Sequence, residues 1–167
     1  MEYFENLTDA ELLLLQDALP YIAVLVSGAD GEIDEEERNW AAKLSHIRSF
    51  ANAHKELLPF YEQIQANFKS KFSEFLKDLP ADATQRNARI GEILSPINAI
   101  LPKLSPKLSY SIYHSYVTFA KRVAEVSGGF FGFGSITAEE SVAMRLRFLT
   151  PIAEPPKPTS SDLSKED

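Results

Sequence analysis

Apolar residues recur three or four positions apart along most of the chain, which is the spacing of one helix face, and strand signals are few. Thr8-x-x-Glu11 forms a capping box, a pattern typical of helix starts, in front of the apolar run 12–15. Pro20 is expected to kink or split this first helix, because proline has no N–H to donate inside a helix. Residues 21–27 would then form a second, buried segment.

The same spacing predicts several later helices. Trp40, Ala41, Leu44 and Ile47 share a face, as do Phe68, Phe72 and Phe75. Prolines divide the pattern, because they are tolerated only in the first turn of a helix. The predicted helices cover 34–51, 54–79, 83–101 with a kink at Pro96, 106–127, and 137–149.

Two short stretches resemble each other. In 26–37, Val-Ser-Gly is followed by a loop and then by Ile-Asp-x-x-Glu; in 126–140, Val-Ser-Gly is followed by a loop and then by Ile-Thr-x-x-Glu. In both, a glycine suits the end of a helix, and Asp34 or Thr137 suits the N-cap of the next. Either helical proteins reuse this punctuation by chance, or a helix–loop–helix is duplicated. The predicted fold class is all-α, a multi-helix bundle with a duplicated helix–loop–helix at its two ends.

The first loop is acidic. Aligned with an EF-hand loop, its carboxylates Asp30, Asp34 and Glu37 take positions five, nine and twelve. Val26 and Gly28 would take positions one and three, and neither has a side-chain oxygen. The loop is therefore not a conventional EF-hand. It still offers carboxylates and backbone carbonyls to a hard divalent cation such as Ca²⁺ or Mg²⁺.

A plainer interpretation of this loop stays open. Asp30-Gly31 is an ordinary turn, and Asp34 is an ordinary N-cap. Residues 35–37 are glutamates in a first helical turn, where negative charge is favoured by the helix dipole. In this interpretation the segment binds nothing.

The second loop, 129–134, has no carboxylate and is a poor cation site. Its phenylalanines Phe130, Phe131 and Phe133 either pack against the core or are exposed to a partner as an apolar patch. No Lys-Ser/Thr follows its glycines, so it does not match a phosphate-binding loop.

Composition excludes several function classes. The 167 residues are 44% apolar with a net charge of −7, and the chain shows no basic cluster of the kind that nucleic-acid binders carry. The chain has no cysteine, and its three histidines lie in no metal or catalytic motif. We therefore expect a protein that is not an enzyme and does not bind nucleic acid.

Location and domain limits follow from the two termini. Residues 1–6 do not form a signal peptide, and the longest apolar stretch, 18–26, is shorter than a membrane span. A cytoplasmic protein that is not itself transmembrane is expected. Residues 1–150 form the predicted helical domain, and 151–167, rich in proline and polar residues, a disordered tail.

The acidic loop Ala29-Asp-Gly-Glu-Ile-Asp-Glu-Glu-Glu37, together with the second loop 124–140, resembles the TerB-like family, named for tellurite resistance. The resemblance does not extend to 51–106. It implies an all-helical bundle with duplicated halves and a divalent-cation site on Asp30, Asp34 and Glu37. It also implies a role in stress or metal-resistance complexes, often with membrane-associated protein partners. The second loop is aromatic and has no carboxylate, so it does not fit a metal site built from both loops.

Overall fold

The computed structural model describes residues 2–27, 43–50, 55–126, 142 and 145–156, and within these ranges the regular structure is helical with no strand. The all-α fold class is confirmed. Residues 43–50 and the isolated positions 142 and 145 are helical. The remaining elements are η1 (Glu2–Phe4), α1 (Asp9–Ser27), η2 (Lys55–Leu57), α3 (Leu58–Asp78), α4 (Ala83–Leu94), α5 (Ile97–Ile100), η3 (Leu101–Lys103) and α6 (Pro106–Val126).

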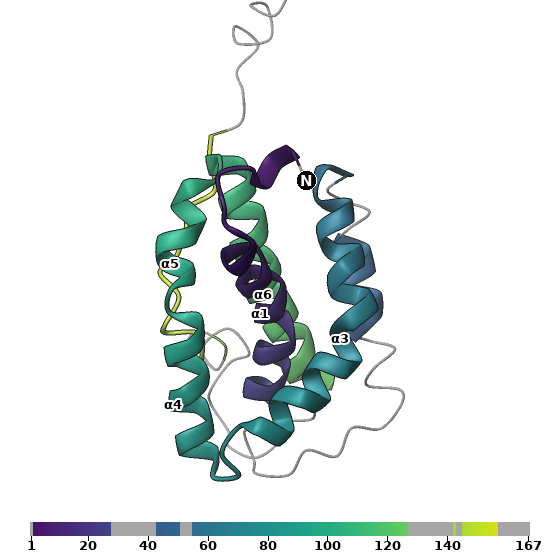
Figure 1. Ribbon diagram of the computed structural model, residues 1–167, viewed down its shortest axis with the longest axis vertical. Coiled ribbons are helices and arrows are strands. Elements are labelled where there is room, and N and C mark those ends of the chain that lie inside the picture. The colour runs from purple at the N-terminus through teal and green to yellow at the C-terminus, as the bar shows by residue number, and fades with distance from the viewer. Residues whose placement is uncertain (1, 28–42, 51–54, 127–141, 143–144, 157–167) are drawn as a thin grey trace, which may run out of the picture.

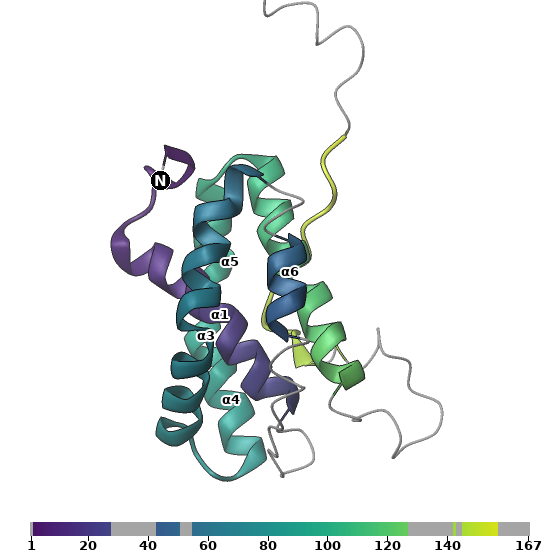
Figure 2. The same cartoon turned by 90° about the vertical axis from the view of Figure 1, so that its right-hand side faces the viewer.

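The helices run along one common axis in both directions, and α1 lies in the middle of the bundle (Figure 1). In that view α1, α3 and α6 run downward, whereas α4 and α5 run upward. The segment 145–156 then runs upward beside α6 (Figure 2). Since α1 contacts α3, α4, α5 and α6, it is the element around which the others pack.

The capping box at the start of α1 is confirmed. The Thr8 backbone N–H donates to Glu11 Oε2 at 2.9 Å, and the Glu11 backbone N–H donates to Thr8 Oγ1 at 3.3 Å. Lys103 also donates to Glu11. These contacts lower the pKa of Glu11, with the Lys103 bond the largest cause. They fix the first turn of α1 to η3.

The expectation that Pro20 divides the first helix is wrong, because α1 continues through Pro20 to Ser27. Proline removes one hydrogen bond, the one to the Gln16 carbonyl, at a cost of about 3 kcal/mol. All but one of the residues from Ala18 to Ser27 are buried. Burial of each large apolar side chain among them stabilises the fold by about 1.5–3 kcal/mol. The summed free energy of packing therefore exceeds the cost of the missing hydrogen bond.

By length and composition α1 could also cross a membrane, which the stretch 18–26 considered alone could not. It is the one such helix in the part of the chain that the structure describes. Of its apolar window, 56% is buried inside the bundle. Contacts with α3 and α6 account for this apolar character without a membrane.

The starts and breaks of the later helices agree with the positions of the prolines. Pro59 lies in the first turn of α3, and the three phenylalanines of its predicted face, Phe68, Phe72 and Phe75, are all buried. Pro96 separates α4 from α5, as the predicted kink requires. Pro106 begins α6. The predicted final helix, 137–149, lies partly outside the described residues, and 151–156 have no regular structure.

The buried hydroxyl of Tyr116 connects α6 to α1 in the core. Tyr116 is fully buried, and its Oη donates to the Leu15 carbonyl at 2.7 Å, connecting α6 to α1.

We predict that Tyr116→Phe lowers the free energy of unfolding by about 1 kcal/mol, the usual value of one such bond. Tyr113→Phe, a half-buried position on the same helix, is the control and should change stability by less than about 0.5 kcal/mol. Urea denaturation measures both. Equal stability of Tyr116→Phe and wild type would show that the bond contributes nothing.

Candidate functional site

The candidate site is the end of the bundle at which α1 and α6 stop. The predicted cation ligands Asp30, Asp34 and Glu37 lie outside the described residues, and so do Phe130, Phe131 and Phe133. The helices that lead into both loops are described, as are parts of the segments that follow them. Their geometry shows where the two loops begin.

Both loops begin at the same end of the molecule. Lys103, just before α6, pairs with Glu11 near the start of α1, and Tyr116 halfway along α6 bonds Leu15. The two helices therefore run side by side in the same direction, and both end at the bottom of Figure 1. Ser27 and Val126 are the last described residues of the two helices, at the Val-Ser pair that each repeat places before its glycine. The predicted helices that precede the two glycines are confirmed, and the duplication itself stays a prediction.

A lysine is buried at this end. Lys43, the first described residue after the acidic loop, is 0% exposed, and its Nζ donates to Ser27 Oγ at 3.3 Å. The same Nζ lies 5.3 Å from the centre of the Phe72 ring, a cation–π distance. Burying a lysine amine is costly without polar partners, and the Ser27 hydroxyl is one such partner at the last described residue of α1.

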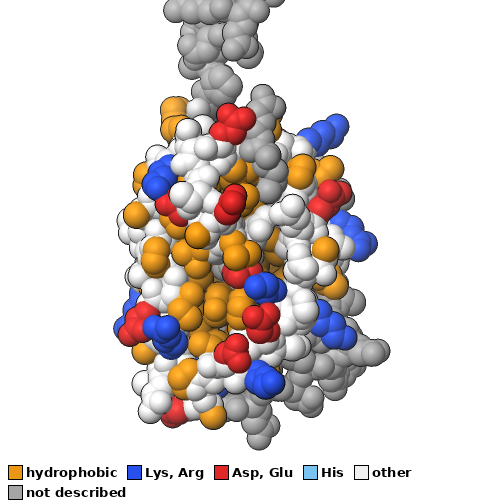
Figure 3. Space-filling view, viewed as in Figure 1, with side chains coloured by type: hydrophobic (Ala, Val, Ile, Leu, Met, Phe, Trp, Pro, Cys, Tyr) orange, Lys and Arg blue, Asp and Glu red, His pale blue; other side chains and the backbone are white. Residues whose placement is uncertain are grey.

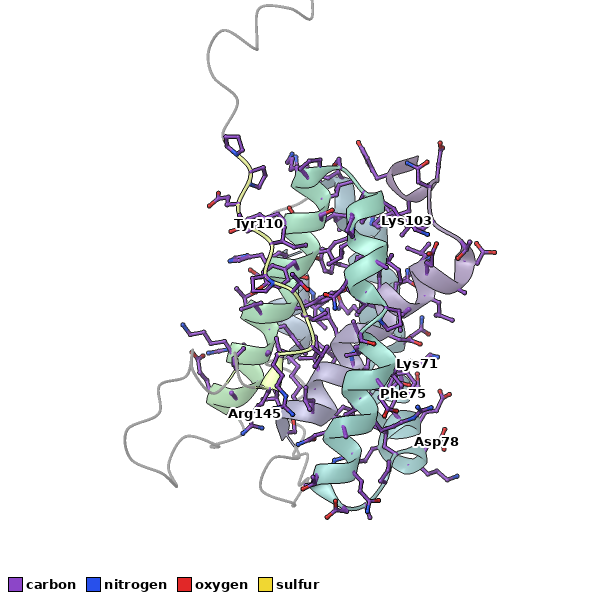
Figure 4. All side chains as sticks on the ribbon, turned by 90° about the vertical axis from the view of Figure 1, so that its left-hand side faces the viewer. Lys71, Phe75, Asp78, Lys103, Tyr110 and Arg145 are labelled. Atoms are coloured by element: carbon purple, nitrogen blue, oxygen red, sulfur yellow. The ribbon has the colours of Figure 1, made fainter. Side chains whose placement is uncertain are left out.

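An arginine that follows the second loop binds the same helix end. Arg145 Nη1 lies 3.2 Å from the Val26 carbonyl and 3.5 Å from the Leu25 carbonyl. The last four carbonyls of a helix have no partner within the helix, and Arg145 supplies one from 119 residues further along the chain. Figure 4 shows Arg145 and Lys103 at opposite ends of the bundle. The segments after both loops thus bring basic side chains to the end of α1.

Neither basic residue was singled out from the sequence. Lys43 is four positions before Ile47, a predicted core residue that is 1% exposed, so helical spacing already placed it on the buried face. Its charge argued against that placement, because lysine is rarely buried unless it is paired. No sequence pattern indicates the role of Arg145, because its partners are backbone carbonyls distant in sequence.

His46 lies on the helix that follows the acidic loop, against α6. Its ring is 6.2 Å from that of Phe119 and 6.0 Å from that of Phe50. The Nε2 atom is buried with no hydrogen-bond partner among the described residues. Burial lowers the pKa of His46 below 6.5, Arg122 lowers it further, and Glu125 opposes the shift. The folded protein thus favours the neutral ring.

The described part of this end contains no assembled metal or catalytic group. Within the described ranges no three His, Cys, Asp or Glu side chains converge as metal ligands. The described part of the arrangement places Lys43 and Arg145 against the last described turn of α1.

Comparison of the chain with family models, with curated proteins and with solved structures gives no match. The function is therefore argued from the site.

The neutral His46 predicts a dependence of stability on pH. The unfolded chain takes up this proton near pH 6.5, whereas the folded chain resists it. Stability from this group is complete above pH 6.5 and is lost as the pH falls through the lowered pKa of the folded state. We predict that wild type loses more free energy of unfolding between pH 7.5 and pH 5 than His46→Gln does. Denaturant titrations at the two pH values measure the difference, with exposed His114→Gln as the control. A loss as large in His46→Gln as in wild type would contradict the assignment.

Proposed function

We propose that the chain is a cytoplasmic TerB-like helical module that binds a divalent cation, Ca²⁺ or Mg²⁺, or acts as an adaptor in a stress or metal-resistance response, and that it is not an enzyme. The observation that carries the proposal is the parallel course of α1 and α6, which brings the starts of both loops to one end of the bundle. A duplicated helix–loop–helix with a shared binding end would be built in this way.

The acidic loop supplies the cation half of the proposal. Asp30, Asp34 and Glu37 follow α1 within ten residues of its end at Ser27. Carboxylate oxygens are the ligands that Ca²⁺ and Mg²⁺ prefer. In the adaptor half of the proposal, the chain binds protein partners, including membrane-associated ones. Its net charge of −7 favours partners with basic surfaces.

Titration calorimetry with Ca²⁺, Mg²⁺ and Mn²⁺ tests the cation half. We expect binding by wild type and at least a tenfold weaker affinity for Asp30→Asn/Asp34→Asn/Glu37→Gln, because these amides keep the shape and the N-cap but remove the charge. Glu62→Gln/Glu74→Gln/Asp78→Asn, three exposed carboxylates on α3, is the control for net charge. Absence of binding at millimolar cation, or equal affinity in the two variants, would remove the cation site.

One observation favours a second candidate, a protein-interaction domain without metal. Lys43 and Arg145 already place two positive charges at the end of α1. Carboxylates of the acidic loop that pair with such charges would have a structural role. Binding would then fall to the second loop, through Phe130, Phe131 and Phe133.

Affinity capture distinguishes the second candidate. We expect Phe131→Ser/Phe133→Ser to lose partners that wild type retains, because exposed aromatic side chains dominate interfaces. The triple amide variant of the acidic loop should keep those partners and serves as the matched control. Identical partner sets for wild type and the serine variant would exclude this loop.

A further inference from the structure

A groove crosses the face of the molecule shown in Figure 3, between α3 and α4 and over α1. Its volume is about 710 Å³. Apolar side chains gather at its centre, and charged side chains border them (Figure 3). The lining residues are Tyr21 from α1; Glu74, Phe75 and Asp78 from α3; Leu79 and Pro80; and Gln85, Ala88, Arg89, Glu92 and Ile93 from α4.

The floor of the groove is aromatic and rigid. The rings of Tyr21 and Phe75 are parallel within 1° and their centres are 3.8 Å apart. Phe75 is 7% exposed, and Lys71 Nζ lies 5.3 Å from the centre of its ring. Figure 4 shows Lys71, Phe75 and Asp78 in succession near the α3 side of the molecule. A floor held by stacking and core packing is already formed before any ligand binds.

The side chains that line the groove include more carboxylates than basic groups, although Lys71 also lies beside its floor. Glu74 and Asp78 lie one turn apart on α3, and Glu92 lies on the opposite wall. Arg89 is the one basic residue of the lining, and it pairs with Glu92 at 3.0 Å. Three carboxylates thus face one guanidinium. Burial first, and then the charges of Asp17 and Glu74, raise the pKa of Tyr21, while Arg89 opposes the shift.

A second, separate hollow of about 40 Å³ lies between α1 and α3, nearer the start of α1. Its lining includes Leu13, Gln16 and Gln63, together with the Asp17–Lys71 ion pair of 3.5 Å. Leu13 is 49% exposed there. From Leu13 to Tyr21 the helix rises by about 12 Å, a little over two turns. Leu13 and the aromatic floor of the groove are thus two apolar contact points about 12 Å apart along α1, with the Asp17–Lys71 ion pair between them.

We propose that this groove binds an amphipathic basic helix of a partner protein, with its apolar face over Tyr21 and Phe75 and its lysines or arginines against Glu74, Asp78 and Glu92. Helix-in-groove binding uses anchors three or four residues apart, which suits walls made of two helices. The described residues offer no strand edge to which an extended peptide could add. Opposite charge along the border selects a basic helix over an acidic one.

This inference rests on the adaptor half of the proposed function and gives it a partner class. It is independent of the cation half, because no groove residue belongs to either loop. Failure of the groove experiment would leave the cation titration unaffected, and the reverse is also true.

Fluorescence anisotropy with labelled 18-residue peptides tests the groove on the full chain. The first probe set has leucines on one helical face and lysines on the other, in several registers. The second replaces lysine with glutamate, and the third scrambles the first so that no apolar face remains. We expect wild type to bind at least one peptide of the first set, to bind the other two sets at least about tenfold more weakly, and to lose affinity as salt rises.

Two variants locate the binding. Ala88 is exposed on the groove wall, so Ala88→Arg adds bulk and positive charge without disturbing the core. Thr84→Arg makes the same charge change on α4 at an exposed position that does not line the groove. We expect Ala88→Arg to weaken binding about tenfold or more and Thr84→Arg by less than about twofold. Circular dichroism confirms that both are folded.

Three results would overturn the proposal. They are no binding by any lysine peptide up to millimolar concentration, equal binding of the scrambled peptide, and equal affinity of Ala88→Arg and Thr84→Arg. The second result would show attraction to the acidic surface as a whole rather than to the groove.

Discussion

Burial of α1 is the constraint on which the rest of the structure depends. This helix contacts α3, α4, α5 and α6, and from Ala18 onward all its described residues except Tyr21 are buried. A helix that is apolar on most of its circumference must be surrounded by protein or lipid. The other helices meet this need by packing along it, and the proline at position 20 is tolerated because the surrounding contacts hold the backbone in place.

Polar contacts then fix where along α1 each neighbour lies. Glu11 ties the first turn to Lys103, the Leu15 carbonyl accepts from Tyr116, and the carbonyls of the last turn accept from Arg145. Apolar packing alone is non-directional, and these bonds give it a register. Because the first two contacts come from η3 and α6 in chain order, they also make α1 and α6 run in the same direction. That direction brings the starts of both loops together.

Local signals made much of the fold predictable. The capping box at Thr8, the break at Pro96 and the aromatic face of α3 depend on neighbours within a few residues, so the sequence contains their causes. Pro20 was misjudged because its tolerance depends on tertiary burial, which local rules do not include. The candidate site was predictable only in part. The ends of α1 and α6 follow from the Val-Ser-Gly repeats, whereas Lys43 and Arg145 act through contacts that form only after folding. The groove over Tyr21 and Phe75 required the relative placement of three helices.

The parallel course of α1 and α6 has an electrostatic consequence. Each helix concentrates roughly half an elementary negative charge at its C-terminus, through the aligned dipoles of its peptide groups. Because α1 and α6 run in the same direction, the negative ends of their two dipoles are directed to the same end of the bundle. Antiparallel neighbours would cancel this field, and here it adds. The guanidinium of Arg145 and the ammonium of Lys43 therefore lie where the backbone itself favours positive charge.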